Sequence, residues 1–342
     1  MSRILVIKMT ALGDVVAALP HMEQICRTYA GGEIWLLTSP EAKTLFRHHP
    51  FFRVRTINRD SFFGKEGVLP TIQWVRSMGF DRIFDLQGNK VSYRICKWSK
   101  SPERIGTQPN PAYTKSAPGK WVRTIKQNVS QRLNKTLEAG GVRPATQPGP
   151  LYTSAEDIQA AERFMSLHEL EEKRFAVVHA GSSPEWLSKR WPRENFAQLV
   201  EMFELFGIPC VVTGSHVEQD LNRYITENAG VNATGVLSLR QLYILAREAL
   251  FAVSNDSAPM HLFSQAGIPV FAFFGPTNYR WSHGFGQIAN VIKSDLECSQ
   301  CFKPQCPPGK KHACMRSLTP ELVLGKIIER LGESGKIVKN GE

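Results

Sequence analysis

Two blocks of alternating apolar strands and amphipathic helices limit the folds open to this chain of 342 residues. A segment dense in proline and glycine, residues 144–150, separates the blocks and predicts a linker. The alternation is typical of parallel sheets covered by helices on both faces. A chain of this length also exceeds the usual size of a single hydrophobic core. We therefore predict an α/β protein of two Rossmann-like domains that face an interdomain cleft, where ligands of such sheets bind.

The predicted boundaries follow from this pattern. We expect domains at residues 1–148 and 149–318, followed by a helix and tail at 319–342 for which packing on the first domain is an open alternative. The expected strands are residues 3–9, 34–38, 54–57, 82–86, 174–179, 208–213 and 250–254, with another after the helix that starts at Ala258. The other expected helices are 14–29, 40–48, 70–78, 121–139, 154–167, 193–206, 218–229, 239–247 and 320–331, and a long surface loop is expected at 100–118.

The charge of the chain is concentrated in one segment. The net charge is +11, and residues 90–143 hold twelve Lys or Arg against two Glu, a local surplus of +10. Such a surplus favours an anionic partner, namely a nucleic acid, an acidic membrane surface or a phosphorylated or carboxylated substrate. The segment has no RNA-reading motif and few interleaved aromatic residues, which disfavours a nucleic acid. The alternative interpretation, a basic surface that is only solvated and binds no partner, is not excluded by the sequence.

Apolar runs in the chain are short. None reaches the ~20 residues that a membrane-spanning helix requires. The N-terminal run at residues 4–7 is shorter than the roughly 7–15 residues of a signal-peptide core. We therefore expect a cytoplasmic protein, with peripheral contact to the inner membrane as an alternative.

Four of the seven cysteines lie close together near the C-terminus, at Cys298, Cys301, Cys306 and Cys314. In a cytosolic protein this spacing suggests a structural metal or a redox-labile cluster, although the later gaps are not those of a standard zinc finger. A packed loop without metal is equally open.

Polar turns follow several of the predicted strands. Asp256 and Ser257 precede a helix, and the free N–H groups of a helix start can hold a phosphate. Asp14 follows the first strand, where a carboxylate can act as a general base or simply cap the helix. Lys189 can balance a departing diphosphate, and Glu218 can hold a ribose, unless both are solvated surface residues.

These segments together resemble a known family. Lys8-x4-Gly13-Asp14, Lys189-x-Trp-Pro192, Asn255-Asp-Ser-x-Pro-Met-His-Leu262 and Phe274-Gly-Pro-Thr277 resemble the heptosyltransferases of lipopolysaccharide biosynthesis, glycosyltransferase family 9 with the GT-B fold. Asp85-Leu-Gln-Gly88 and the cysteine cluster ending at Cys314-Met315 extend the resemblance over nearly the whole chain. Family members usually carry Thr-Gly where this chain has Ser257-Ala258.

The resemblance implies that the first domain binds an acceptor and the second a nucleotide sugar. It implies Asp14 as the base, Lys189 as the catalytic contact to the diphosphate, Glu218 at the ribose and Leu237 at adenine. The implied donor-binding set is Ser182, Ser183, Lys189, Glu218, Leu237, Asp256, Ser257, Ala258 and His261. The implied acceptor-binding set is Lys8, Gly13, Gln87 and Arg94.

The expected function is an inverting glycosyltransferase that moves a sugar, with heptose from ADP-heptose favoured, onto an anionic lipopolysaccharide core acceptor. Because the chain has no Asp-x-Asp motif, we expect metal-independent transfer with no required cofactor. The basic segment would contact the acceptor or the inner membrane surface. A nucleotide-sugar epimerase on the same scaffold, or a transferase using another sugar nucleotide, is the alternative, and the oligomeric state stays open.

Overall fold

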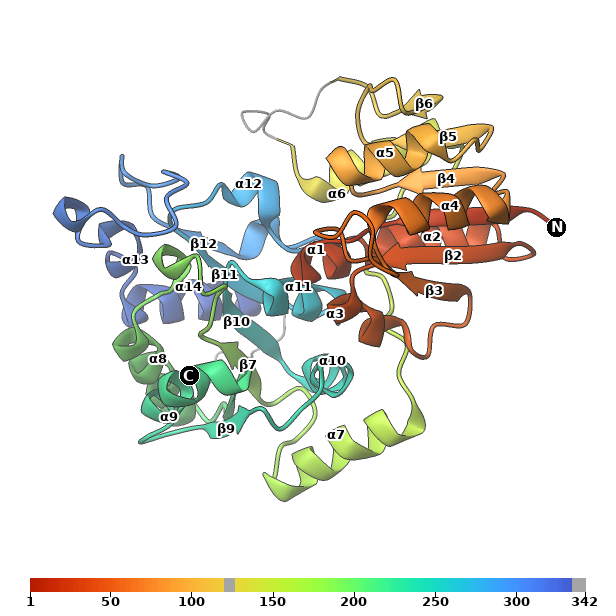
Figure 1. Ribbon diagram of the computed structural model, residues 1–342. Helices are drawn as coiled ribbons and strands as arrows, with labels where there is room; N and C mark the ends of the chain where they lie inside the picture. The colour runs from red at the N-terminus through yellow and green to blue at the C-terminus, as the bar shows by residue number, and fades with distance from the viewer. Residues whose placement is uncertain (120–126, 334–342) are drawn as a thin grey trace. The chain divides into compact units, whose positions relative to one another are not determined.

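The chain divides into two units, Met1–Tyr152 and Thr153–Glu342, each built on one parallel sheet (Figure 1). The computed structural model describes residues 1–119 and 127–333. The observed division falls four residues after the expected boundary, two residues beyond the proline-rich segment.

The first unit holds six parallel strands in the order β3-β2-β1-β4-β5-β6. The strands are β1 (Arg3–Ile7), β2 (Glu33–Thr38), β3 (Phe52–Thr56), β4 (Arg82–Asp85), β5 (Glu103–Gly106) and β6 (Lys115–Ser116). The helices are α1 (Leu12–Ala17), α2 (Leu19–Thr28), α3 (Pro40–Lys43), α4 (Val68–Met78), α5 (Lys90–Trp98) and α6 (Val129–Ala139).

Helices cover both faces of this sheet. Helices α4 and α5 pack together over one face, and α2 and α6 pack together on the other (Figure 1). Ile4, Leu5, Val6 and Ile7 of β1 are fully buried, as expected for a central strand covered on both sides. The core therefore lies on both sides of β1 and β4.

Three expectations for this unit differ from the structure. The helix expected at 14–29 is broken at Ala18, because Pro20 lacks the N–H that a continuous helix needs at this point. The loop expected at 100–118 contains the short strands β5 and β6, and α5 was not predicted at all. Part of the helix expected at 121–139 lies outside the described residues, and α6 begins at Val129 with Asn128 as its cap.

The second unit repeats the arrangement, with its sheet in the order β12-β11-β10-β7-β8-β9. The strands are β7 (Ala176–His179), β8 (Cys210–Gly214), β9 (Val231–Thr234), β10 (Phe251–Asn255), β11 (Val270–Phe274) and β12 (Val291–Lys293). The helices are α7 (Ala155–Leu167), α8 (Arg193–Leu205), α9 (Gln219–Ile225), α10 (Leu239–Glu248), α11 (Ala258–Gln265), α12 (Tyr279–Ser282), α13 (Ala313–Arg316) and α14 (Pro320–Glu333). Two of its short 3₁₀ turns adjoin candidate site residues: η2 (Leu187–Lys189) and η3 (His216–Glu218).

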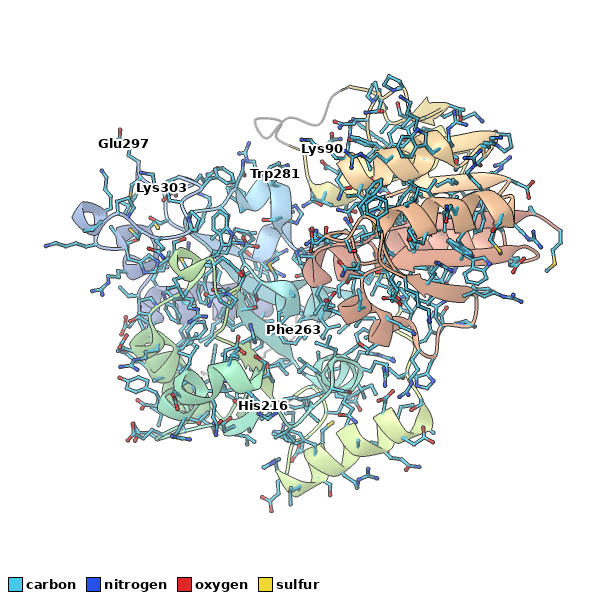
Figure 2. All side chains as sticks on the ribbon, in the orientation of Figure 1. Lys90, His216, Phe263, Trp281, Glu297 and Lys303 are labelled. Atoms are coloured by element: carbon cyan, nitrogen blue, oxygen red, sulfur yellow. The ribbon has the colours of Figure 1, made fainter. Side chains whose placement is uncertain are left out.

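Helix α14 belongs to the core of this second unit. Val323, Leu324, Ile327 and Leu331 pack with the apolar side chains of α8 in one cluster. The apolar stripe of the C-terminal helix is thus buried against α8 within its own unit, and packing of the helix and tail on the first domain stays a prediction. Phe263 of α11, labelled in Figure 2, is fully buried as well.

Both sheets reverse their strand order at an equivalent place. The reversal lies between β1 and β4 in the first unit and between β7 and β10 in the second. Parallel sheets of this order bind ligands beyond the carboxyl ends of the strands at that reversal. Each unit therefore has one preferred place for a ligand. Within the described residues, no helix has both the length and the apolar character to cross a lipid bilayer.

Candidate active site

Asn255 organises the strand reversal of the second unit. Its side chain is fully buried at the end of β10, and its Oδ1 accepts a hydrogen bond from the Trp191 backbone N–H at 3.0 Å. Its Nδ2 donates to the Ala180 carbonyl at 2.7 Å and to the Gly181 carbonyl at 3.2 Å. One amide thus joins the ends of β7 and β10 to the turn before α8, a role that the sequence did not reveal.

Lys189, Asp256 and Thr277 meet beside this amide. The Lys189 Nζ lies 2.9 Å from Asp256 Oδ2, and the two side chains are 19% and 6% exposed. The Thr277 hydroxyl donates to the same oxygen at 2.7 Å. The Lys189 ammonium also lies 5.1 Å from the centre of the Trp186 ring. Asp256 therefore aims the ammonium, which has three donors and can still bind an anion.

Helix α11 begins directly after this cluster. Ser257 occupies the cap position without a side-chain bond to the helix, and its hydroxyl instead pairs with that of Ser254 at 3.2 Å. The N-terminus of α11 therefore has no side-chain cap. Ala258 has an ordinary negative φ, so its methyl group causes no backbone strain here. The uncapped helix start can accept an anion.

The two predicted serines have different environments. Ser182 is buried, donates to the Trp186 carbonyl at 3.0 Å and accepts from Arg190 Nε at 3.2 Å. Ser183 is exposed and bonds to the Glu185 carboxylate. Ser182 therefore shapes the turn together with Arg190, a cation to which the sequence reading gave no role.

Glu218 lies at the ends of β7 and β8. It is 9% exposed, and its Oε2 accepts a hydrogen bond from the Ser215 backbone N–H at 2.7 Å. A Cβ at Gly181 would lie 2.3 Å from Glu218 Oε1, so a larger residue at position 181 would displace this carboxylate. Burial lowers the pKa of the neighbouring His179 imidazole, an effect that the Glu218 charge opposes.

The remaining predicted donor residues are half-buried. Leu237 lies in the loop between β9 and α10, and His261 lies one turn into α11. Their proximity to a nucleotide stays a prediction.

In the first unit, Gln87 closes the loop that follows β1. Its Oε1 accepts from the N–H groups of Met9 at 2.8 Å and Thr10 at 3.0 Å, and its Nε2 donates to the Thr10 hydroxyl at 3.0 Å. Gln87 is held in turn by the fully buried Asp85, which accepts from the Gln87 N–H at 2.9 Å and from the Tyr113 hydroxyl at 2.6 Å. Gln87 therefore shapes the loop with the groups expected to contact the acceptor.

Lys8 begins this loop, and Gly13 and Asp14 lie in the first turn of α1 that follows it. Lys8 is only 5% exposed, and its ammonium has no hydrogen-bond or ion-pair partner among the described residues. Asp14 is exposed, and its Oδ2 accepts from the Ala11 N–H at 3.1 Å, as a helix-capping carboxylate does. Arg94 lies apart from them on the exposed side of α5. A buried cation that no described residue pairs with, in the same segment of chain as an exposed carboxylate, suits an anionic substrate with a reactive hydroxyl.

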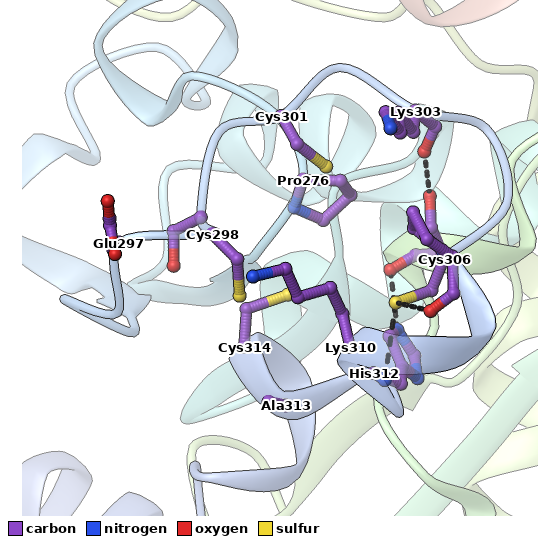
Figure 3. Close-up of a pocket in the computed structure, with 13 residues that line it drawn as sticks. Pro276, Glu297, Cys298, Cys301, Lys303, Cys306, Lys310, His312, Ala313 and Cys314 are labelled. Carbon is purple, nitrogen blue, oxygen red and sulfur yellow. Dashed lines mark hydrogen bonds between the residues drawn. The ribbon is translucent and has the colours of Figure 1, made fainter.

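The four C-terminal cysteines line one pocket of about 290 Å³ together with Lys310 and His312 (Figure 3). Burial and the other three cysteines raise the pKa of the Cys314 thiol to about 11. In residues 1–119 and 127–333, no group of three or more His, Cys, Asp or Glu is arranged to hold a metal ion. The cysteines thus share a pocket, but the geometry defines no metal site there.

Comparison with protein families and curated proteins relates this chain to the heptosyltransferases that its sequence motifs resemble. The model of glycosyltransferase family 9 (heptosyltransferase) matches residues 68–312. Lipooligosaccharide heptosyltransferase 2 of Campylobacter jejuni is 28% identical over 147 residues, 41% of this chain and 46% of that protein. Lipopolysaccharide heptosyltransferase 1 of Pseudomonas aeruginosa is 22% identical over 326 residues, 89% of this chain and 87% of that protein. The chain spans just under half the length of the Campylobacter relative in this match.

Solved structures share the whole fold. A family 9 glycosyltransferase of Veillonella parvula has a TM-score of 0.77 at 20% identity, covering 97% of both chains. The Escherichia coli heptosyltransferase WaaC with ADP-2-deoxy-2-fluoro heptose has a TM-score of 0.67 at 18% identity, covering 96% of this chain and 99% of that chain. The iron-containing TibC of E. coli is more distant, with a TM-score of 0.59 at 14% identity, covering 98% of this chain and 80% of that chain. The predicted pair of Rossmann-like domains of the GT-B type is confirmed.

Proposed function

The chain belongs to glycosyltransferase family 9, the heptosyltransferases, and we propose that it transfers heptose from ADP-heptose to a lipopolysaccharide core acceptor. The observation that carries this proposal is the Lys189–Asp256–Thr277 cluster at the strand reversal of the second sheet. Support for the donor comes from the ADP-sugar analogue that the WaaC structure contains. Support for the acceptor comes from the names of the curated relatives.

The second unit holds the donor in this proposal. The diphosphate binds the Lys189 ammonium and the N–H groups at the start of α11, where Ser257 leaves the helix uncapped. Glu218 holds the ribose, Leu237 contacts the adenine, and His261 and Ala258 lie beside the sugar. Fixed donors of this kind can stabilise the charge of a leaving group, at about 3–4 kcal/mol for one strong contact.

The first unit holds the acceptor. Lys8 and the exposed cations of α5, Arg94 among them, attract its phosphates or carboxylates. Asp14 accepts the proton of the acceptor hydroxyl while that oxygen forms a bond to the anomeric carbon. The bond from this carbon to the diphosphate oxygen breaks on the opposite side, and its electron pair leaves with the diphosphate. The configuration at the anomeric carbon is therefore inverted.

A panel of nucleotide sugars tests the proposal. Wild-type protein is incubated with ADP-heptose and with UDP-, GDP- and other ADP-sugars, each with and without a lipopolysaccharide core acceptor. We expect a glycosylated acceptor from ADP-heptose and no isomerised donor when the acceptor is absent. A Lys189→Met variant controls for contaminating activity. An isomerised donor without acceptor would favour the epimerase, and transfer only from another donor would change the sugar assignment.

Metal independence is a separate part of the proposal. It rests on the fixed charge of Lys189 and the start of α11, which take the place of a divalent cation. We expect transfer to continue in EDTA at an unchanged rate. Loss of activity that magnesium restores would overturn this part, and elemental analysis of the purified protein would detect iron or zinc in the cysteine pocket.

A further inference from the structure

The loop that carries the four cysteines, residues 297–314 and here called the cysteine loop, is bonded to the residue next to Lys189. Ser188 donates its backbone N–H to the Pro304 carbonyl at 3.0 Å and its hydroxyl to the Lys303 carbonyl at 2.6 Å. The Ser188 carbonyl accepts a hydrogen bond from His312 Nε2 at 2.7 Å. The three polar groups of Ser188 are thus all bonded to the cysteine loop, and Ser188 is buried.

The same loop holds the turn that precedes Thr277. Gln300 donates its N–H to the Gly275 carbonyl at 2.7 Å, and Phe302 donates to the Pro276 carbonyl at 2.8 Å. A Cβ at Gly275 would lie 2.8 Å from Cys314 Sγ, so this thiol packs directly against the turn. The cysteine loop therefore contacts the segments that carry two of the three members of the Lys189–Asp256–Thr277 cluster.

The backbone of the cysteine loop is strained where it makes these bonds. Gln300, Phe302, Lys311 and His312 all have positive φ, between 47° and 57°. They are four of the seven non-glycine residues with positive φ in the described part of the chain. Side chains disfavour this conformation, so it persists only where surrounding contacts impose it. Strain concentrated beside a candidate active site suggests a role in that site.

His312 occupies the centre of this arrangement. Its backbone N–H donates to the Cys306 thiol at 3.2 Å, while its ring donates to Ser188 (Figure 3). The exposed residues Glu297 and Lys303, both labelled in Figure 2, show where the cysteine loop lies. The Cys306 thiol thus holds the backbone of His312, and the imidazole of His312 holds the backbone beside Lys189.

We propose that the cysteine loop positions the Lys189 ammonium for the diphosphate, with His312 as the positioning residue that acts through Ser188. This rests on the proposed function, because Lys189 must contact the donor for its position to matter. The bonds at Gly275 and Pro276 hold Thr277, and through it Asp256, in register with the same ammonium. In this proposal the cysteines help to position Lys189 by packing against the loop and the turn at Gly275, whether or not they also bind a metal ion.

The test replaces His312 and measures ADP affinity by calorimetry together with transfer kinetics. In His312→Ala we expect ADP affinity to fall about 10-fold and kcat to fall about 10- to 100-fold, since small misplacements of a charged group are costly. The acceptor KM should not change. His312→Gln can donate from a similar position and should recover most of the loss. Lys311→Ala, an exposed residue in the same left-handed turn, is the matched control and should behave as wild type.

A double-mutant cycle separates positioning from general stability. In a Lys189→Ala background, His312→Ala should cause no further loss of ADP affinity or kcat, because the group that it positions is gone. An equal further loss would overturn the proposal, as would wild-type ADP affinity and kcat in the single variant. Should His312→Ala fail to fold, Ser188→Ala removes only the bond to Lys303 and enters the same cycle. A wild type that binds no nucleoside diphosphate and transfers no sugar would refute the proposed function and the positioning role together.

Discussion

Asp85 and Asp256 are both buried carboxylates at the ends of central strands, yet their surroundings give them different chemistry. Asp85 accepts hydrogen bonds from the Gln87 and Gly88 N–H groups and from the Tyr113 hydroxyl. Burial raises the pKa of the Asp85 carboxyl, and the hydrogen bonds that it accepts act in the opposite direction. Asp256 instead holds the Lys189 ammonium. Asp85 therefore builds a turn, whereas Asp256 aims a charge.

Asp14→Asn tests the proposed base. The Asn side-chain oxygen can still accept from the Ala11 N–H, so the local structure should be retained. Turnover should fall about 10²- to 10⁴-fold, the range for loss of a general base, while ADP affinity stays unchanged. Steady-state kinetics and calorimetry measure both. Near-normal turnover would leave Asp14 as a helix cap alone.

Lys189→Met tests the ion pair. The variant leaves the Asp256 charge buried with only the Thr277 hydroxyl, and stability should fall by about 2–3 kcal/mol. This is less than the ~3–5 kcal/mol for a fully buried pair, because Lys189 keeps about a fifth of its side chain exposed. Adding Asp256→Asn should recover part of that loss. Urea denaturation of the single and double variants measures this, and strictly additive effects would contradict the pairing.

At the scale of elements, the basic segment 90–143 does not form one uniform surface. Arg132 of α6 is buried and donates to the Pro118 carbonyl at 2.7 Å, and Lys115 pairs with Glu103 at 2.8 Å. Helix α5, by contrast, exposes Lys90, Arg94 and Lys97 at helical spacing, and Lys90 is labelled in Figure 2. Lys120, Arg123 and Lys126 lie outside the described residues. The cations of α5 are therefore the best candidates for contact with an anionic acceptor.

Charge reversal on α5 should raise the acceptor KM. Arg94→Glu with Lys97→Glu should increase it several-fold at low salt and less at high salt, since the Debye length falls from ~30 Å at 0.01 M to ~8 Å at 0.15 M. Donor affinity should not change. Lys135→Glu with Arg143→Glu, exposed cations elsewhere in the same unit, make a control with equal charge change. An equal rise in both variants would mean that only net charge matters.

The contact between α2 and α6 should make the stability of the first unit depend on pH. His21 of α2 is fully buried and bonds to the Ser130 carbonyl of α6 at 3.0 Å. Burial lowers the pKa of His21 from 6.5 to about 4. The unfolded chain therefore binds more protons than the folded one between these values, and stability falls as pH drops from 6.5 towards 4. The full loss is about 3 kcal/mol.

Unfolding of wild type and His21→Gln across that pH range checks this expectation. His21→Gln cannot titrate and should show a shallower slope. His49 has its pKa lowered to about 4 by burial as well, so some slope should remain in the variant. An identical slope in both proteins would mean that the pKa of His21 is the same in the folded and unfolded states.

At the scale of the whole molecule, the two units share one strand order but carry different chemistry at the reversal. The second unit presents a cation held by a carboxylate and an uncapped helix start. The first presents a buried lysine and an exposed carboxylate. The same strand order thus supports two different sites, because the residues that follow the strands can change without altering the sheet.

Donor binding should stabilise the second unit selectively. In hydrogen exchange of the full chain, ADP at 100 times its dissociation constant should slow exchange in the turns around residues 180–190 and 255–262. The corresponding free energy is about 2.7 kcal/mol. The loop at residues 8–14 should show little change. Protection confined to residues 8–14 would reverse the assignment of donor and acceptor to the two units.

Local sequence patterns were sufficient for most of the architecture. Long amphipathic helices such as α7 and α8 and buried strands such as β10 carry their periodicity within a few residues, so they could be predicted. The strands β5, β6, β9 and β12 span at most four residues each and were missed. Strands this short, at a sheet edge or next to it, leave few positions for a pattern, and pairing with the neighbouring strands defines them.

The motifs located Lys189, Asp256 and Thr277, because polar residues after buried strands are visible in the chain. These three residues are far apart in the sequence. The ion pair joins Lys189 to Asp256, 67 positions later, and the hydrogen bond joins Asp256 to Thr277, 21 positions later. The bonds of His312 to Ser188 and of Asn255 to Trp191 span 124 and 64 positions. Backbone carbonyls and N–H groups accept any donor or acceptor of suitable geometry, so residue identity does not encode such partners. Packing of the sheet and its loops brings them together.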